Sequence, residues 1–354
     1  MAHVTTRDSY RRLVDRLNRF PQGAPPSELL YKILQMLFSE REAGLVALLP
    51  IRPFTAKRAA RVWNTTPAAA TAILEELAGR AILLDMESVD GTRTFVLPPP
   101  MAGFFEFSLM RVRGDLDQKV LSELFYQYLN VEEDFIKALF ADGQTQLGRV
   151  FVQERALPGN GNGTTAGEGA VDPGIHVLDY ERASEVIKTA SHRGVGVCYC
   201  RHKMHHMDRA CGAPMEICMT FNATAQSLVK HGVARRMDVA EGLDLLARAQ
   251  DENLVQFGEN IQQRVNFICH CCGCCCNLLE GIRKHGYVHV AASSSFIARS
   301  DDGTCKGCNH CEKACPIDAI RMVPDTDPGR KRKKRPQVDE EICLGCGVCV
   351  LRCR

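Results

Sequence analysis

The sequence predicts an α+β protein in which a mainly helical N-terminal region precedes a cysteine-rich C-terminal region. Three observations support this prediction. Apolar residues recur every three or four positions through much of the chain before residue 142, as in amphipathic helices. Two strand-like runs, 81–88 and 92–98, flank Asp90 and Gly91, a dipeptide typical of tight hairpin turns. All 18 cysteines of the 354-residue chain lie between Cys198 and Cys353.

The N-terminal elements follow one another in a recognisable order. Helices are predicted at 10–20, 27–41, 55–63 and 68–80, and the hairpin follows them. Thr55 is the expected N-cap of the third helix. Two helices, a turn, a further helix and a hairpin make the outline of a winged helix. We predict that fold for residues 25–98, within a winged-helix-like domain spanning 1–98.

A winged helix suggests DNA binding, but the composition of its second turn-motif helix argues against it. That helix normally contacts bases, and here its polar residues are chiefly Thr71, Glu75 and Glu76. Carboxylates repel phosphates, so DNA binding is not expected and a docking role is favoured. Three basic residues of the preceding helix could still meet phosphate: Lys57, Arg58 and Arg61. A redox-sensing winged-helix DNA-binding regulator therefore remains an alternative.

A helical segment is predicted for 99–157. An apolar run after Pro98 is expected to pack into the core through Phe104, Phe105, Phe107, Leu109 and Met110. Residues 115–142 predict two helices with a break near Asn130. Residues 158–174 are nearly all turn formers and small polar residues, which predicts a flexible linker. A short strand at 175–180 and a helix at 181–190 are expected next.

The net charge and the expected cellular compartment limit the partners and the thiol chemistry that we expect. The net charge of +2 gives no general reason to expect a nucleic acid partner. The N-terminus lacks the apolar stretch of a secretory signal, and no run of about 20 apolar residues occurs, so we expect a cytoplasmic protein without a membrane span. Reduced thiols are expected there, which favours metal ligation over disulfides.

Two C-terminal segments carry the pattern Cys-x2-Cys-x2-Cys-x3-Cys, and Pro316 follows the fourth cysteine of the first segment. This is the ligand spacing of bacterial two-cluster ferredoxins, in which the fourth cysteine of each motif binds the other cluster. The similarity implies a two-[4Fe-4S] ferredoxin-like domain spanning 299–354. One cluster would be held by Cys305, Cys308, Cys311 and Cys353, and the other by Cys343, Cys346, Cys349 and Cys315.

The C-terminal segments depart from the ferredoxin pattern in two ways. The long insert between them holds six consecutive basic residues, Arg330 to Arg335, which are expected either to form a solvated loop or to dock an acidic electron carrier. The sequence also ends one residue after Cys353, without the proline and strand of the first half. We therefore expect either a truncation or an outer wall of the second cluster site that comes from elsewhere.

The other ten cysteines fall in a predicted cysteine-rich iron-sulfur domain spanning 175–298, and six of them are packed into eight residues. Their candidate metal ligands are Cys198, Cys200, Cys211, Cys218, Cys269, Cys271, Cys272, Cys274, Cys275 and Cys276. Cys269, Cys272 and Cys275 recur every third residue, so we expect them to face one cluster while Cys271 and Cys274 face another, with the first four cysteines completing both. This predicts about two further [4Fe-4S] clusters.

Other arrangements of these ten thiols remain open. A zinc site uses four thiolates and could account for part of the region, as could redox-active thiols. A non-cubane cluster with an open iron would instead be an active site. Arg201 and His202 could place positive charge near an anionic cluster, although His202, His205 and His206 are each expected to lie on an exposed turn.

The motif order CYCR, a spaced cysteine pair, CHCCGCCC and a ferredoxin module resembles a family of cytoplasmic multicluster 4Fe-4S ferredoxin-type proteins of anaerobic bacteria and archaea. The resemblance covers roughly Val195 to the end and extends to PPPMAGFFEF. It implies an accessory electron-transfer subunit or partner of a larger oxidoreductase. No nucleotide-phosphate loop, G-x-G-x-x-G fingerprint or flavin motif occurs, so we predict a non-catalytic relay of single electrons. An oxidoreductase with a substrate-binding cluster at the six clustered cysteines is the alternative.

Overall fold

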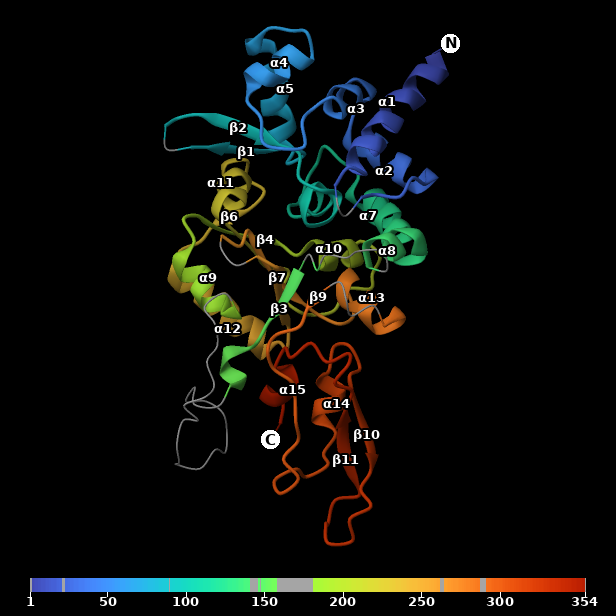
Figure 1. Cartoon of the computed structure of the whole chain (residues 1–354), viewed down its shortest axis with the longest axis vertical. Helices are drawn as coiled ribbons and strands as arrows, with labels where there is room; N and C mark the ends of the chain where they lie inside the picture. Colours follow the sequence, from blue (N-terminus) through green and yellow to red (C-terminus); the bar gives the residue numbers. More distant parts are fainter. Residues whose placement is uncertain are drawn as a thin grey trace. The chain divides into compact units, whose positions relative to one another are not determined.

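The structure is a computed structural model that describes residues 2–20, 23–88, 90–140, 146, 148–157, 181–261, 264–286 and 291–353 (Figure 1). The predicted linker at 158–174 and the predicted strand at 175–180 lie outside the described residues. The chain forms two compact units, each built from two segments. The first unit comprises Met1–Gln144 and Ser191–Met237, and the second Thr145–Ala190 and Asp238–Arg354.

The first unit begins with α1 (Ala2–Leu17), α2 (Glu28–Leu37) and α3 (Glu40–Ala47). The prediction of one helix over 27–41 is wrong, because the chain leaves the helix at Phe38 and starts another after Ser39. The Ser39 side chain accepts a hydrogen bond from Glu42 N, and the Glu42 carboxylate accepts one from Ser39 N. This capping box satisfies the otherwise unpaired amides at the start of α3.

The next elements agree with their predicted positions. Thr55 caps α4 (Ala56–Val62), as expected, by accepting a hydrogen bond from Arg58 N, and Thr66 caps α5 (Pro67–Gly79). Strands β1 (Leu84–Glu87) and β2 (Arg93–Val96) pair antiparallel, which confirms the hairpin. Gly91 in its turn has a φ of +78°, a value that favours glycine.

An aromatic core follows the hairpin. The segment formed by η1 (Pro100–Phe104) and α6 (Phe105–Ser108) buries the five apolar side chains that were predicted to pack inside, including Phe104 and Phe105, whose rings lie 4.9 Å apart. The predicted break near Asn130 is also confirmed. A π-helical turn, η2 (Gln127–Val131), separates α7 (Gln118–Tyr126) from α8 (Glu133–Phe140).

Three strands complete the first unit, in the order β6, β4, β5. The central strand β4 (Arg193–Val197) pairs antiparallel with β5 (Glu216–Phe221) and with β6 (Arg235–Arg236). Helix α10 (Tyr199–His205) follows β4, and α11 (Asn222–Lys230) follows β5. Glycine and cysteine interrupt the apolar pattern here, so the sequence did not predict these strands.

A buried carboxylate joins the hairpin to α11. The Asp85 side chain on β1 is 1% exposed and accepts hydrogen bonds from Lys230 Nζ at 2.6 Å, His231 Nε2 at 2.8 Å, Ser227 Oγ at 2.9 Å and Arg93 at 2.6 Å. These hydrogen bonds outweigh the opposing effect of burial and hold the pKa of Asp85 well below its usual range. The hairpin is therefore fixed to a helix that lies far along the sequence.

The second unit contains four strands in the order β8, β7, β3, β9. Strand β7 (Val255–Glu259) pairs antiparallel with β8 (Phe267–Cys271) and with β3 (Gly148–Phe151), which also pairs parallel with β9 (Ala291–Ala292). The helices of this part are α9 (Ala183–Thr189), α12 (Val239–Asp251) and α13 (Asn277–His285), with a short turn η3 (Glu154–Ala156). Asp238 caps α12 by accepting a hydrogen bond from Glu241 N.

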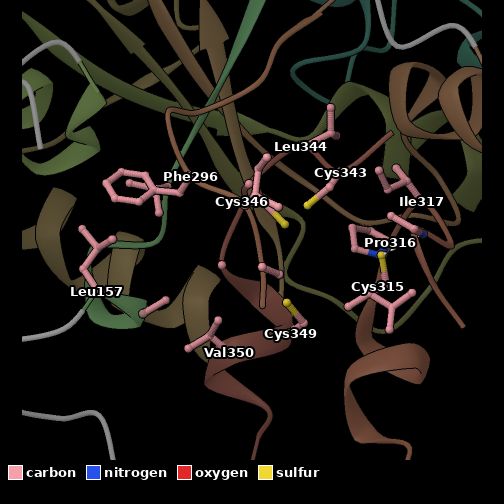
Figure 2. Close-up of a pocket in the computed structure, with 18 residues that line it drawn as sticks. Leu157, Phe296, Cys315, Pro316, Ile317, Cys343, Leu344, Cys346, Cys349 and Val350 are labelled. Carbon is pink, nitrogen blue, oxygen red and sulfur yellow. Dashed lines mark hydrogen bonds between the residues drawn. The ribbon is translucent and has the colours of Figure 1, made fainter. Parts of the chain in front are cut away.

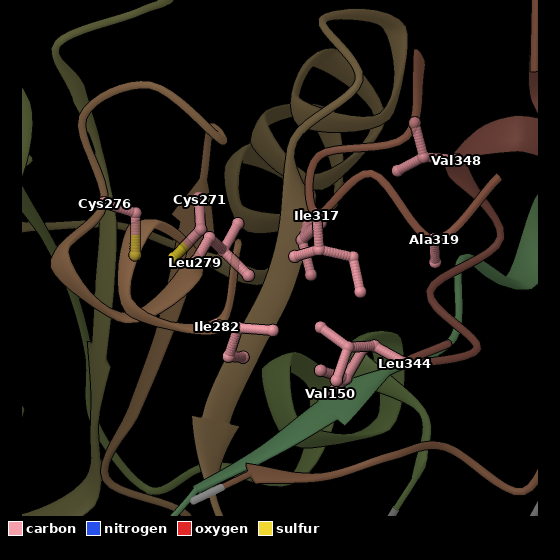
Figure 3. Packing of buried hydrophobic residues seen from close by; sticks show 10 residues of the cluster. Val150, Cys271, Cys276, Leu279, Ile282, Ile317, Ala319, Leu344 and Val348 are labelled. Atoms are coloured by element: carbon pink, nitrogen blue, oxygen red, sulfur yellow. The ribbon is translucent and has the colours of Figure 1, made fainter. Parts of the chain in front are cut away.

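The C-terminal part of this unit contains α14 (His310–Ala314), the hairpin strands β10 (Ile320–Pro324) and β11 (Lys334–Val338), and α15 (Val348–Leu351). One hydrophobic cluster packs residues of β3, β7 and α13 against this part. Figure 3 shows Leu279 and Ile282 from α13 among Val150, Ile317, Leu344 and Val348. Across the described residues, no helix is long and apolar enough to cross a membrane.

Candidate iron-sulfur and metal sites

Four cysteines line one cavity of about 250 Å³ in the C-terminal part of the second unit: Cys315, Cys343, Cys346 and Cys349. Figure 2 shows their sulfur atoms around a common space, with Leu157, Phe296 and Val350 among the other lining residues. These are the four cysteines that the crossed ferredoxin ligation assigns to one cluster. The structure thus brings together a set that spans both sequence motifs.

The wall of this cavity includes residues from outside the two ferredoxin motifs. These outside wall residues come from segment 296–298 and from the residues around η3. They are Val152, Ala156, Leu157, Phe296, Ile297 and Ala298. Two backbone hydrogen bonds attach these segments to the cysteine loop, from Ser294 N to Leu344 O at 3.1 Å and from Gln153 N to Cys346 O at 3.0 Å. An outer wall from elsewhere was one of the two possibilities that the sequence predicted.

Glycine is required in this loop at Gly345. Its φ is +65°, and a Cβ atom there would lie 2.1 Å from Phe296 O and 2.3 Å from Ser294 Oγ. Any side chain would therefore push the loop away from the 294–296 segment. The close approach places Cys343 and Cys346, on either side of Leu344 and Gly345, at the cavity wall.

The chemistry of this cavity fits a [4Fe-4S] cluster. Burial raises the pKa of Cys346 and of Cys349 to about 12, and it raises the pKa of Cys315. Thiolates are therefore costly here without a cation, whereas a bound metal stabilises them. Ala319 N donates a hydrogen bond to Cys315 Sγ at 3.2 Å, an interaction that favours negative charge on sulfur. Four thiols, an apolar wall and an amide donor are the features that a cluster requires.

The other ferredoxin thiols form a more exposed group. Burial raises the pKa of Cys311, and the nearby thiols of Cys305 and Cys308 raise it further. His310 Nδ1 lies 3.1 Å from Cys308 Sγ. Cys353, the predicted fourth ligand, is exposed just beyond α15. Two of the four predicted ligands thus lie in the loop before α14 and Cys311 lies in α14, while the assignment of Cys353 stays a prediction.

The basic insert has an internal role that the sequence analysis missed. Arg332 donates hydrogen bonds to Asp302 at 2.7 Å, to the carbonyl oxygen of Cys305 at 3.2 Å and to Asp325. Arg330 pairs with Asp302 at 3.1 Å and with Asp327 at 3.0 Å. The acidic residues at 302, 325 and 327 were the sequence signal for this clasp, because they offset the two arginines.

The hairpin that carries the basic insert packs directly on the first cluster loop. Gly307 has a φ of +68°, and a Cβ atom there would lie 2.3 Å from Lys334 O. Lys331, Lys333, Lys334 and Arg335 are exposed, unlike Arg332. The basic run therefore divides into two arginines that hold the loop and four cations that face solvent.

The six clustered cysteines divide into two sets, but the predicted grouping by every third residue is wrong. Sulfur atoms of Cys272, Cys274 and Cys275 all lie within 4.8 Å of one another, and the Cys274 and Cys275 sulfurs are 3.7 Å apart. The Cys271 thiol instead hydrogen-bonds with those of Cys269 and Cys276, and these contacts together with burial raise its pKa.

Backbone conformation explains this division. Cys269 and Cys271 belong to strand β8, where side chains two residues apart share a face. The chain then turns at 273–275, which brings the side chains on both sides of Gly273 together, before Cys276 starts α13. Neither strand β8 nor the turn after it repeats every three residues, so the spacing in the sequence gave the wrong grouping of cysteines.

The four earlier cysteines lie in the first unit around α10. The Cys198 thiol hydrogen-bonds with that of Cys218, and this contact and burial raise its pKa, whereas the nearby Arg201 guanidinium lowers it. Cys200 lies within α10, and Cys211 in the loop before β5. Arg201 therefore places positive charge beside the Cys198 thiol, and its position near a cluster stays a prediction.

The expectation that three histidines lie on an exposed turn is wrong, because His202 and His205 belong to α10 and only His205 of the three is exposed. His202 is 6% exposed, and its Nδ1 lies 2.7 Å from Leu109 O, so it belongs to the packing of α10. No disulfide joins any of the 18 cysteines, all of which belong to the part of the chain that the structure describes.

The comparisons with known proteins single out the C-terminal part. Residues 304–354 match the family model of the 4Fe-4S dicluster domain. Neither the comparison with curated proteins nor that with solved structures finds a match. The chain therefore carries a ferredoxin-type iron-sulfur domain, and the matched residues contain all eight cysteines that the spacing assigned to clusters.

Proposed function

We propose that this protein is an electron carrier that relays single electrons through several [4Fe-4S] clusters, to or from a larger oxidoreductase. The observation that supports it best is the cavity lined by Cys315, Cys343, Cys346 and Cys349 within the dicluster domain. Bound clusters would supply reversible one-electron chemistry. The protein residues supply thiolate ligands, exclude water and orient the ligand loops.

Each cluster site has a distinct surrounding, which is what a relay between different partners requires. Cys346 is at the apolar, buried site, and burial of an anionic cluster lowers its reduction potential. The site of Cys305, Cys308 and Cys311 is more exposed to solvent, and exposure of an anionic cluster raises its reduction potential. The two sites are thus expected to differ in potential.

Further clusters in the cysteine-rich region belong to the same proposal. Candidate ligands for them are the cysteines of that region, without an assigned grouping. A bound metal would stabilise such buried thiols in the thiolate form. The winged-helix assignment of residues 25–98 is likewise proposed, with docking to a partner subunit as its role.

Iron content tests the number of clusters. Protein purified anaerobically is expected to contain more than about eight iron atoms per chain, because the ferredoxin domain alone accounts for two four-iron clusters. Iron and acid-labile sulfide should be measured together with the EPR spectrum of the reduced protein. Eight irons or fewer would exclude additional clusters, and a chain that takes up no iron would exclude the relay itself.

The exposed cations of the basic insert are proposed to dock an acidic electron carrier. Lys331 and Lys333 flank Arg332, whose side chain contacts the Cys305 loop, and Lys334 lies against Gly307 of the same loop. A negatively charged carrier held at this surface would be close to the first cluster site. Charge complementarity of this kind acts mainly by accelerating association.

A triple variant, Lys331→Ala with Lys333→Ala and Lys334→Ala, tests this docking surface. The rate of electron exchange with a small acidic ferredoxin is expected to fall about tenfold at low salt, and the difference should vanish at high salt. The matched control removes three exposed cations of α4, Lys57, Arg58 and Arg61, and should leave the rate unchanged. Equal effects of both variants would show that only net charge matters.

A further inference from the structure

We infer that Cys272, Cys274 and Cys275 hold a single zinc ion, and that this set is not the site of a cubane cluster. The three belong to the turn between β8 and α13. This inference goes beyond the relay, because zinc carries no electrons and would have a structural role.

The zinc assignment rests on the distances between the cysteine sulfur atoms. A tetrahedral zinc ion with Zn–S bonds of about 2.3 Å holds its sulfurs about 3.8 Å apart. The Cys274 and Cys275 sulfurs lie 3.7 Å apart, and the three sulfurs lie within 4.8 Å of one another. Three thiolates already arranged around the volume of one ion need little rearrangement to bind it.

The ferredoxin site of the same unit provides the contrast. Its four cysteines line a cavity of about 250 Å³. In a cubane each ligand sulfur bonds a different iron, so the four sulfurs lie farther apart than sulfurs that share one ion. The narrow turn of Cys272 to Cys275 and the wide cavity at Cys346 therefore suit different metal groups. Thiolate ligands favour zinc among the common divalent ions.

The position of the turn indicates what the ion would do. A Cβ atom on Gly273 would lie 2.5 Å from Pro316 O, so the turn contacts the backbone that follows Cys315. Residues on both sides of Gly273 would be zinc ligands. Zinc would thus fix the turn against Pro316 and hold the Cys315 loop at the cluster cavity.

Metal analysis of the full-length protein tests the assignment. Protein produced with both iron and zinc is expected to contain about one zinc atom per chain. Cys274→Ser should lose it, falling below about a tenth of an atom, while the iron of the ferredoxin domain remains. Cys274 is exposed, so this substitution disturbs the core little. The matched control is Cys269→Ser. It changes the set of Cys269, Cys271 and Cys276 and should retain the zinc.

A second readout identifies the geometry independently of zinc loss. Cobalt bound in place of zinc should give the visible absorption of a tetrahedral thiolate site, and Cys274→Ser should abolish that absorption without changing the far-ultraviolet circular dichroism.

Two outcomes would overturn the inference. One is wild-type protein with fully loaded ferredoxin clusters and no zinc. The other is a Cys274→Ser variant that loses about four irons and no zinc, which would assign a cubane to the turn. Absence of iron with zinc still at one atom per chain would defeat the proposed relay and leave this inference standing.

Discussion

Replacement of Cys346 by alanine is expected to remove about four iron atoms per chain and to leave the other ferredoxin cluster in place. Cys346 lines the buried cavity, its carbonyl accepts a hydrogen bond from Gln153 N, and its side chain packs against the hydrophobic cluster of the second unit. No water can replace the missing thiolate readily in this apolar site. EPR of the reduced protein should show the signal of the buried cluster disappear.

Crossed ligation makes this prediction sharper. Cys315→Ala changes the first motif, yet it should give the same spectrum as Cys346→Ala, because both thiols line one cavity. Cys305→Ala should give the complementary spectrum. Val350→Ala is the matched control, since Val350 lines the same cavity without offering a ligand. A Cys315→Ala spectrum that matches Cys305→Ala instead would refute the crossed assignment.

Replacement of Asp85 by alanine is expected to lower the stability of the first unit by about 3 kcal/mol. The change leaves Lys230, His231 and Arg93 without their shared carboxylate, and partial exposure of Lys230 and Arg93 limits the loss. Urea denaturation followed by circular dichroism measures it. Asp115→Ala is the control, because Asp115 is 58% exposed in its pair with Arg113 and should cost less than about 1 kcal/mol.

The pH dependence of this stabilisation has a defined sign. The pKa of Asp85 is lower in the folded protein than in the unfolded chain, since hydrogen bonds to its carboxylate favour the charged form. The contribution of Asp85 to folding stability is therefore fully present above the pKa of the unfolded chain, about 3.9. It is lost only as the pH falls below that pKa. The difference in stability between wild type and Asp85→Ala should therefore shrink as the pH falls below about 4. A difference that stayed the same as the pH fell from about 4 to about 2 would contradict this account.

Cluster ligation fixes cysteine spacing within each motif, whatever the surrounding fold, so the sequence alone is enough to propose the ferredoxin ligands. The crossed ligation of two-cluster ferredoxins further predicts Cys315 with Cys346, and both line one cavity. The wall residues at 152–157 and 296–298 could not be predicted, because long-range packing brings them to the cavity and no local motif marks them.

Features marked by a local motif were also easier to predict among the helix boundaries and strands than features that no local motif marks. Thr55 caps its helix as predicted, since a cap depends on a few neighbouring residues. Ser39 was missed because the apolar pattern continues across it from α2 into α3. Strand β8 was missed because the concentration of cysteines hid its alternation, and this also led to the wrong grouping of Cys269 and Cys272.

The attachment of the Cys346 loop to Gln153 and Ser294 means that the ferredoxin part is not an interchangeable module. The sequence motif can be cut out at residue 304, but its surroundings cannot, because Gly345 fits against Phe296 and Gly347 against Ala156. Transplanting the motif into another protein would leave one side of the cavity open to water and oxygen. A fragment that keeps this cavity closed must therefore include the sheet and turn around it, so its boundary is that of the folded unit and not that of the motif.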